Sequence, residues 1–256
     1  MLRSLCSAFL MYSRIPVPKV EWKEENRRYA LCFFPLIGAV IGGLLIVWRI
    51  ACGCLGIGQL LFAAGAVFLP VLVTGGIHMD GFCDVNDARA SYADKEKRLE
   101  IMSDPHIGSF AVIKLCLYLI IQTALFTQIF TVKSAAAIAC GYVLSRALSG
   151  LTAVTFKAAK KEGSLQSFVR PSHKNITITA EIFFSAAAIS AAAVIQPVQA
   201  AAAAASAVLV LLWHRHTAYR NFGGITGDLC GWFLQVCEIA VLAAAVFSER
   251  IFALWK

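Results

Sequence analysis

The sequence predicts an all-α polytopic integral membrane protein with about seven transmembrane helices, in an expected range of six to eight. The first observation is compositional: 59% of the 256 residues are hydrophobic and only 15% are charged, whereas about a quarter are charged in soluble domains. The second is a series of apolar stretches near the roughly 20 residues that cross a bilayer. The third is the uneven distribution of Lys and Arg between the connections. We expect one membrane-embedded domain over residues 1–256.

The predicted spans follow one another along the whole chain. Most are bounded by polar connections, and Pro70 lies inside the second. Between the fifth and the sixth only Gln196 and Pro197 mark a turn, so one bent hairpin is the alternative there. The seven stretches are 29–50, 57–75, 107–130, 134–156, 176–195, 198–213 and 229–247.

Positive charge is concentrated in alternate connections. Seventeen Lys and Arg lie on one predicted side, and four lie on the other: Arg49, Lys133, Arg250 and Lys256. The positive-inside rule therefore places the N-terminus in the cytoplasm and the C-terminus outside. We expect a multi-pass protein of the cell (inner) membrane with its active site facing the cytoplasm, and with cytoplasmic segments near 1–28, 76–106, 157–175 and 214–228.

The uneven distribution of Lys and Arg also explains the formal net charge of +8. Basic connections on the cytoplasmic side attract anionic lipid and phosphorylated substrates. Membrane lipid is therefore an expected partner. Nucleic acid is not needed to explain the charge, and we find no nucleic-acid-binding motif.

Three carboxylates lie within eight residues at the end of the second apolar stretch, namely Asp80, Asp84 and Asp87. In a helix, spacings of four and three residues put them at roughly 0°, 40° and 340° around the axis, on one stripe. A solvated surface would explain such a stripe in a soluble protein, but carboxylates at the border of a bilayer are costly unless they face a cavity or a partner. Hard oxygen ligands suit Mg²⁺ bound to substrate phosphates. We predict that these three aspartates are catalytic and hold Mg²⁺.

A second acidic element, Asp104-Pro-His106, precedes the third span. Asp104 is a candidate catalytic carboxylate, either as a further metal ligand or to orient the nucleophile. His106 is a candidate substrate-binding residue. The structural alternative is a helix start with Asp104 as the N-cap residue and Pro105 as the first helical residue. Both interpretations hold together if the helix N-terminus also binds phosphate.

A glycine-rich turn precedes the last span, in the segment Asn221-Phe-Gly-Gly-Ile-Thr-Gly-Asp228. Closely spaced glycines free backbone N–H groups to form an anion-binding nest. We therefore predict that this turn binds substrate phosphate through the backbone of Gly223 and Gly224 and through the side chains of Thr226 and Asp228. The alternative is a plain connection between two spans.

Two further residues are candidates because of where they lie. Arg146 lies in the middle of the fourth span, where a charge costs several kcal/mol unless it has a negative partner. That partner is either a substrate diphosphate or a carboxylate such as Glu238. His78 lies about 160° from the aspartate stripe if the helix extends back that far, and it is a candidate for substrate binding from behind that stripe.

Four blocks of this sequence resemble the signature motifs of the cobalamin (5′-phosphate) synthases, also called adenosylcobinamide-GDP ribazoletransferases. The resemblance runs in order over almost the whole chain, and Arg14 in the opening block becomes a candidate substrate-binding residue. The blocks are Tyr12-Ser-Arg-Ile-Pro-Val-Pro18, His78-Met-Asp-Gly-Phe-Cys-Asp-Val-Asn-Asp-Ala88, Ile101-Met-Ser-Asp-Pro-His-Ile-Gly108 and Gly223-Gly-Ile-Thr-Gly-Asp228.

The resemblance implies an Mg²⁺-dependent enzyme of late cobalamin assembly. Its substrates would be adenosylcobinamide-GDP and α-ribazole or α-ribazole 5′-phosphate. A ribose hydroxyl would attack the phosphorus that carries the cobinamide, and GMP would leave. The products would be adenosylcobalamin or its 5′-phosphate, together with GMP.

Other classes of membrane protein remain as alternatives. A CDP-alcohol phosphotransferase or an intramembrane prenyltransferase also uses aspartates and a metal-bound diphosphate, but the usual motifs of both are missing from this sequence. A transporter would be expected to have its ionisable groups near the bilayer midplane, whereas here the acids gather near one surface. The sequence leaves the oligomeric state open, and a homo-oligomer is one of the alternatives.

Overall fold

The computed structural model describes residues 1–160 and 162–254. Lys161 and Lys256, which both contribute to the charge bias, lie outside the described residues. Helices make up most of the described chain, and its only β-type pairing is an isolated bridge between Ala158 and Ile225. The elements are α1 (Leu2–Tyr12), α2 (Glu24–Arg27), η1 (Leu31–Phe33), α3 (Phe34–Cys54), α4 (Gln59–Thr74), α5 (Ile77–Ala90), α6 (Lys95–Ile101), α7 (Ser109–Phe126), α8 (Val132–Thr155), α9 (Ser164–Val169), α10 (Lys174–Ile195), α11 (Pro197–Phe222) and α12 (Gly227–Ala253).

The predicted fold class is confirmed. Six described helices are long and apolar enough to cross a membrane, and there are seven spans if α4 and α5, which meet at an angle of 97°, are taken as one broken span. The expected spans correspond in order to α3, α4, α7, α8, α10, α11 and α12. Pro70 lies inside α4 without ending it, and Pro197 begins α11, so residues 176–213 form two helices.

Helix α8 lies at the centre of the bundle and packs against α3, α10 and α12. It approaches α3 closely because α3 carries glycines four residues apart on one face. A Cβ atom at Gly42 would lie 2.8 Å from the carbonyl oxygen of Ala139, and one at Gly38 would overlap the backbone of Tyr142. By contrast, α10 and α11 keep most of their surface outside the bundle and expose apolar side chains such as Phe183 and Leu209. Such an apolar outer surface suits contact with lipid.

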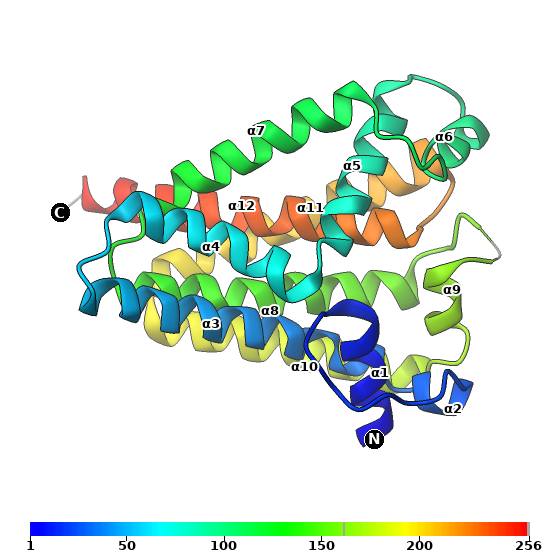
Figure 1. Ribbon diagram of the computed structural model, residues 1–256, viewed down its shortest axis with the longest axis horizontal. Helices are drawn as coiled ribbons and strands as arrows, with labels where there is room; N and C mark the ends of the chain where they lie inside the picture. Colours follow the sequence, from blue (N-terminus) through cyan, green and yellow to red (C-terminus); the bar gives the residue numbers. More distant parts are fainter. Residues whose placement is uncertain (161, 255–256) are drawn as a thin grey trace.

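The short polar elements gather at one end of the bundle. Figure 1 shows α5, α6, α9 and the turn before α12 at the end opposite to the C-terminus, with α1 and α2 toward the same end. The polar segments of the sequence therefore come together in space. The predicted site residues of α5 and the turn before α12 lie in this region.

Candidate functional site

Helix α5 lies across the end of the bundle because two glycines redirect the chain. Gly75 ends α4 with φ +67°, and Gly76 precedes α5 with φ +82°. This left-handed backbone conformation costs a glycine little and other residues more. The bend places the aspartates over the N-terminus of α12 and away from the axis of α4.

Close packing between α5 and α12 depends on the absence of side chains at two positions. A Cβ atom at Gly81 would lie 2.8 Å from both Cα and the carbonyl oxygen of Asp228, and one at Gly231 would lie 3.1 Å from the carbonyl oxygen of His78. Gly81 lies within the aspartate block itself. Its small size brings the acids of α5 up to Asp228 on α12.

The predicted aspartate stripe is helical and is extended by this fourth acid. Asp84, which is partly buried, lies within electrostatic range of Asp80, Asp228 and Asp87. The backbone N–H of Asp80 donates to the carbonyl oxygen of Gly76 at 3.0 Å, but the carboxylates of Asp80 and Asp84 have no hydrogen bond or ion pair with any described residue. Lys160 lies within electrostatic range of Asp228 and Lys114 within range of Asp87, but no described ion pair neutralises Asp80 or Asp84. Because like charges repel one another, these two acids are suited to an external cation.

The structure gives Asp87 a different partner from the other two. Its two carboxylate oxygens accept hydrogen bonds from the backbone N–H groups of Gly108 and of Ala111, the latter at 2.9 Å. These groups belong to the start of α7, where unpaired N–H groups and the helix dipole favour a negative charge. Asp87 therefore holds the start of α7 in place, a role that the spacing of the aspartates does not reveal.

The described residues contain no group of three or more His, Cys, Asp and Glu side chains arranged to hold a metal ion. Mg²⁺, however, commonly uses one or two carboxylates together with substrate phosphates and water. Asp80 and Asp84, one helical turn apart and without protein partners, match that smaller donor set. The residues present therefore fit Mg²⁺ bound jointly with a diphosphate, and they do not form a complete cage for the metal.

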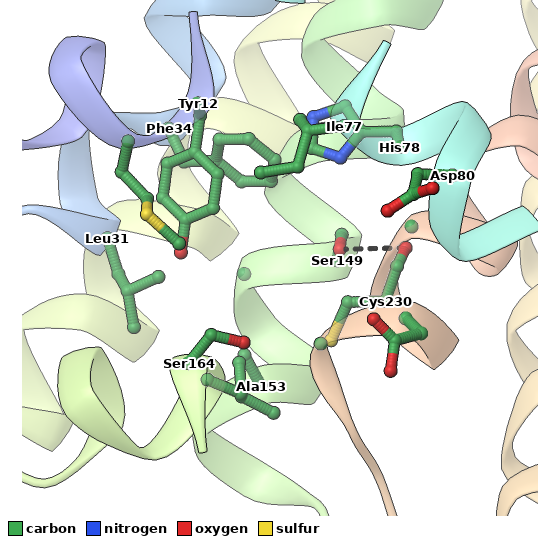
Figure 2. A pocket seen from close by; sticks show the side chains of 16 residues that line it. Tyr12, Leu31, Phe34, Ile77, His78, Asp80, Ser149, Ala153, Ser164 and Cys230 are labelled. Carbon is green, nitrogen blue, oxygen red and sulfur yellow. Dashed lines mark hydrogen bonds between the residues drawn. The ribbon is translucent and has the colours of Figure 1, made fainter. Parts of the chain in front are cut away.

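A partly enclosed cavity of about 260 Å³, called the enclosed cavity below, lies beside Asp80 and Asp228 (Figure 2). It is formed where α1, η1, α3, α5, α8, α9 and α12 meet. Apolar residues line most of it, and its polar lining includes Tyr12, His78, Asp80, Ser149, Ser164 and Asp228. Asp80 and Asp228 thus contribute to one cavity from two different helices.

A larger and more open groove of about 630 Å³ lies on the other side of Asp80. Arg14 lines it together with Asp80 and the glycines of the bend. The chain near Arg14 is fixed by a hydrogen bond of 2.7 Å from its backbone N–H to the carbonyl oxygen of Val73, and its side chain lies against Gly75. The structure therefore brings Arg14 and Asp80, both predicted site residues, to one groove.

His78 lies in the first turn of α5 and lines the same cavity as Asp80. It is 6% exposed, and its ring stacks with Tyr12 at a centroid distance of 6.3 Å. Its Nε2 atom has no hydrogen-bond partner in the described structure. The position suits contact with a ligand in the cavity.

Asp104 and His106 lie apart from both the enclosed cavity and the groove. Asp104 accepts hydrogen bonds from the backbone N–H of His106 at 2.9 Å and from its Nδ1 at 2.7 Å. The backbone hydrogen bond is the main reason why the pKa of Asp104 lies below its usual value, and the bond to the imidazole contributes. The expected capping role is wrong, because α7 begins at Ser109 with Gly108 as its N-cap residue.

The glycine-rich turn is held by the protein backbone itself. Gly223 ends α11 with φ +74°. The N–H of Gly224 donates to the carbonyl oxygen of Ala218 at 3.1 Å, and that of Ile225 donates to Lys157 at 2.8 Å. The backbone N–H of Gly223 also donates to the carbonyl oxygen of Ala218, so neither glycine amide is free to bind an anion, and the nest predicted from Gly223 and Gly224 does not hold.

The end of the turn has separate roles. Thr226 is the N-cap residue of α12, and its hydroxyl oxygen accepts a hydrogen bond of 3.2 Å from the backbone N–H of Leu229. Gly227 and Asp228 line the enclosed cavity. Of the four candidate residues in this turn, Asp228 is thus the one whose side chain reaches the site.

Arg146 has the protein partner that the sequence offered as an alternative. It is fully buried in α8, and its Nη1 donates to Oε1 of Glu238 on α12 at 2.7 Å and to the carbonyl oxygen of Tyr142 at 3.0 Å. It lines neither the enclosed cavity nor the groove. The predicted substrate-binding role is therefore replaced by an ion pair inside the bundle.

Sequence reasoning did not assign a role to several residues at the cavity. Tyr12 belongs to the motif block at residues 12–18, which is a usable signal. Ser149 lies in an apolar span that carries no such signal. Glu181 on α10 was also missed, although an acid within an apolar span is a signal. It is fully buried against Gly150, and neither of its carboxylate oxygens has a hydrogen-bond partner among the described residues.

Comparison with known proteins gives one consistent result. Residues 4–246 match the family model described as cobalamin-5-phosphate synthase. A relative from Lachnoclostridium phytofermentans is 42% identical over 250 residues, which cover 98% of this chain and 95% of the relative. Another from Pelodictyon phaeoclathratiforme is 33% identical over 255 residues, covering 98% and 99%. Both relatives are named adenosylcobinamide-GDP ribazoletransferase. No solved structure matches the chain.

Proposed function

We propose, because this chain belongs to the cobalamin-5-phosphate synthase family, that it transfers the adenosylcobinamide-phosphate group of adenosylcobinamide-GDP to α-ribazole or α-ribazole 5′-phosphate. Family membership makes the chain a transferase in cobalamin synthesis. One observation above all supports the assignment of these two substrates. Asp80 lines both the enclosed cavity and the open groove, so one acid borders two spaces that can each hold a substrate.

The reaction needs a ribose hydroxyl oxygen to bond to the phosphorus that carries the cobinamide. The bond from that phosphorus to the oxygen of GMP breaks, and GMP leaves with the electron pair. Phosphoryl transfer depends mainly on positioning and on stabilisation of charge. Mg²⁺, held by Asp80 and Asp84 together with the diphosphate, would supply this stabilisation of charge.

Residues of the chain would position both reactants. Arg14 in the groove is placed to pair with a phosphate oxygen, and a guanidinium can form two parallel hydrogen bonds to it. Asp228 reaches the enclosed cavity from α12, so we assign to it the orientation of the nucleophilic hydroxyl and acceptance of its proton. Asp104 and His106 line neither space, and we assign them no step.

The location of the acids also bears on the rival functions. They gather at the end of the bundle where α5 meets the start of α12, whereas a transporter would be expected to place such groups near the middle of its spans. The CDP-alcohol phosphotransferases and the intramembrane prenyltransferases share the diphosphate chemistry, but the usual motifs of neither class are present in the sequence. An assay of the substrates that the protein accepts therefore distinguishes these enzyme classes.

The assay for this function uses purified protein in vesicles with adenosylcobinamide-GDP, α-ribazole and Mg²⁺. We expect GMP and a corrinoid that carries the nucleotide loop to form in equal amounts, and no GMP to form when α-ribazole is omitted. Parallel reactions with α-ribazole 5′-phosphate determine which nucleophile is preferred. Failure to form GMP with either nucleophile, or release of GMP without one, would contradict the proposal.

In the orientation that we propose, the protein lies in the cell (inner) membrane with this end of the bundle facing the cytoplasm, because seventeen of the Lys and Arg residues are predicted to lie on that side and four on the other. A reporter fused after Lys256 should report the external side, and one inserted in the 157–175 connection should report the cytoplasm. Accessibility labelling of intact cells measures both. Finding the two reporters on the same side would refute the seven-span arrangement.

A further inference from the structure

We infer that the enclosed cavity binds the flat, apolar base of the nucleoside substrate, while the open groove takes the phosphate-bearing part of the larger substrate. The inference rests on the proposed function. It adds an assignment of the two spaces to the two substrates, and it predicts which kind of base the cavity selects.

Aromatic rings form one wall of the cavity. Tyr12 of α1 lies 4.5 Å from Phe34 of α3 between ring centroids, and the His78 ring of α5 lies 5.7 Å from Phe34. All three residues line the cavity. Rings contributed by three separate helices are a suitable surface for stacking against a planar heterocycle.

The opposite side of the cavity is polar. Figure 2 places Tyr12 and Leu31 on one side, and Asp80, Ser149 and Cys230 on the other. The hydroxyl of Ser149 donates a long hydrogen bond of 3.5 Å to the carbonyl oxygen of Cys230. A base stacked at the aromatic wall would therefore place its ribose toward hydroxyl and carboxylate groups, beside the acids assigned to catalysis.

Size separates the two substrates. The enclosed cavity holds about 260 Å³, just below the roughly 300–1,000 Å³ usual for small-molecule sites, and this is suited to one nucleoside. Adenosylcobinamide-GDP carries a corrin macrocycle as well as two nucleosides and cannot fit. The groove of about 630 Å³ is open and contains Arg14, so it is the better place for the diphosphate.

Polarity separates the two candidate bases. Guanine, in the GDP group, presents amide and amino groups that need hydrogen-bond partners when buried. Beyond the rings, the cavity is lined by further apolar residues, which include Met11, Leu31 and Ala153. A benzimidazole-type base, as in α-ribazole, needs far fewer hydrogen-bond partners when it is buried. The geometry therefore favours the base of the nucleophile over guanine.

The test compares the KM values for the two substrates in four variants. Tyr12→Leu removes a stacking ring, and Ala153→Leu fills the cavity from α8. Each should raise the KM for α-ribazole at least tenfold and leave the KM for adenosylcobinamide-GDP within about twofold. Arg14→Gln, in the groove, should show the reverse pattern. Tyr12→Phe keeps the ring and should stay near the parent value for α-ribazole.

A binding measurement keeps the inference testable when turnover is low. Equilibrium dialysis of α-ribazole and of GMP against detergent-solubilised parent and Tyr12→Leu should show weaker binding of α-ribazole alone in the variant. Weaker binding of GMP instead would assign the cavity to guanine and overturn the inference. Normal turnover of the parent with unchanged KM values in both cavity variants would also overturn it while the proposed function stands. A parent that binds α-ribazole through Tyr12 but releases no GMP would contradict the proposed function alone.

Discussion

Replacing Asp84 with asparagine is expected to reduce turnover by a factor of about 10² or more, while the protein still inserts and accumulates. Asparagine preserves the shape of the side chain but removes the charge that lies within range of Asp80 and Asp228. The loss of one carboxylate would leave the cation on the diphosphate with a single protein ligand in α5. The measurement is the initial rate of GMP release at saturating Mg²⁺, normalised to the amount of folded protein.

A matched control is available on the neighbouring helix. Asp94 is exposed, and its side chain caps α6 by accepting a hydrogen bond of 2.8 Å from the backbone N–H of Lys97. Asparagine caps helices as well as aspartate does, so Asp94→Asn removes one negative charge at the same end of the bundle with little structural effect. We expect parent-like rates from it. A rate for Asp84→Asn near that of Asp94→Asn would remove Asp84 from the metal site.

Removing one partner of the buried ion pair between α8 and α12 should have the largest effect on stability. In Glu238→Leu, the guanidinium of Arg146 would remain fully buried with no carboxylate beside it. Breaking a buried pair in this way costs about 3–5 kcal/mol, chiefly because the remaining charge is uncompensated. We expect a clear fall in the midpoint of thermal unfolding in detergent, and a lower yield from the membrane.

The double variant separates this cost from other effects of substitution. In Arg146→Met with Glu238→Leu no charge remains at this place between α8 and α12, and an apolar pair of similar volume can be as stable as the ion pair. We therefore expect the double variant to be more stable than Glu238→Leu alone, which gives a favourable coupling energy in a double-mutant cycle. Additive losses of stability would mean that the two residues contribute independently. A parent-like KM for adenosylcobinamide-GDP in the double variant would support the placement of this ion pair outside the substrate site.

The sequence predicted the spans well because the physical signal for them is local. Long apolar runs identified the membrane helices, and a helical spacing placed Asp80 and Asp84 on one stripe of α5. Glu238 was likewise recognised as a candidate partner, because a charge in the middle of a span needs a counter-charge.

Tertiary packing explains the parts that the sequence did not predict. Asp87 shares the stripe of Asp84, yet the start of α7 occupies its carboxylate. The glycine turn has the composition of an anion nest, but Gly223 and Gly224 donate their N–H groups to the carbonyl oxygen of Ala218 at the end of α11. The cavity around Tyr12 is lined by residues of seven elements, so no single segment of the sequence carries a pattern for it.

The most direct test of the central claim, that the acids of α5 hold a divalent cation together with the diphosphate, is a titration with Mn²⁺ followed by electron paramagnetic resonance. We expect adenosylcobinamide-GDP to tighten the binding of one Mn²⁺ to the solubilised parent and to Asp94→Asn, and we expect this tightening to be lost in Asp84→Asn. Equal substrate-dependent Mn²⁺ binding in all three proteins would contradict the account.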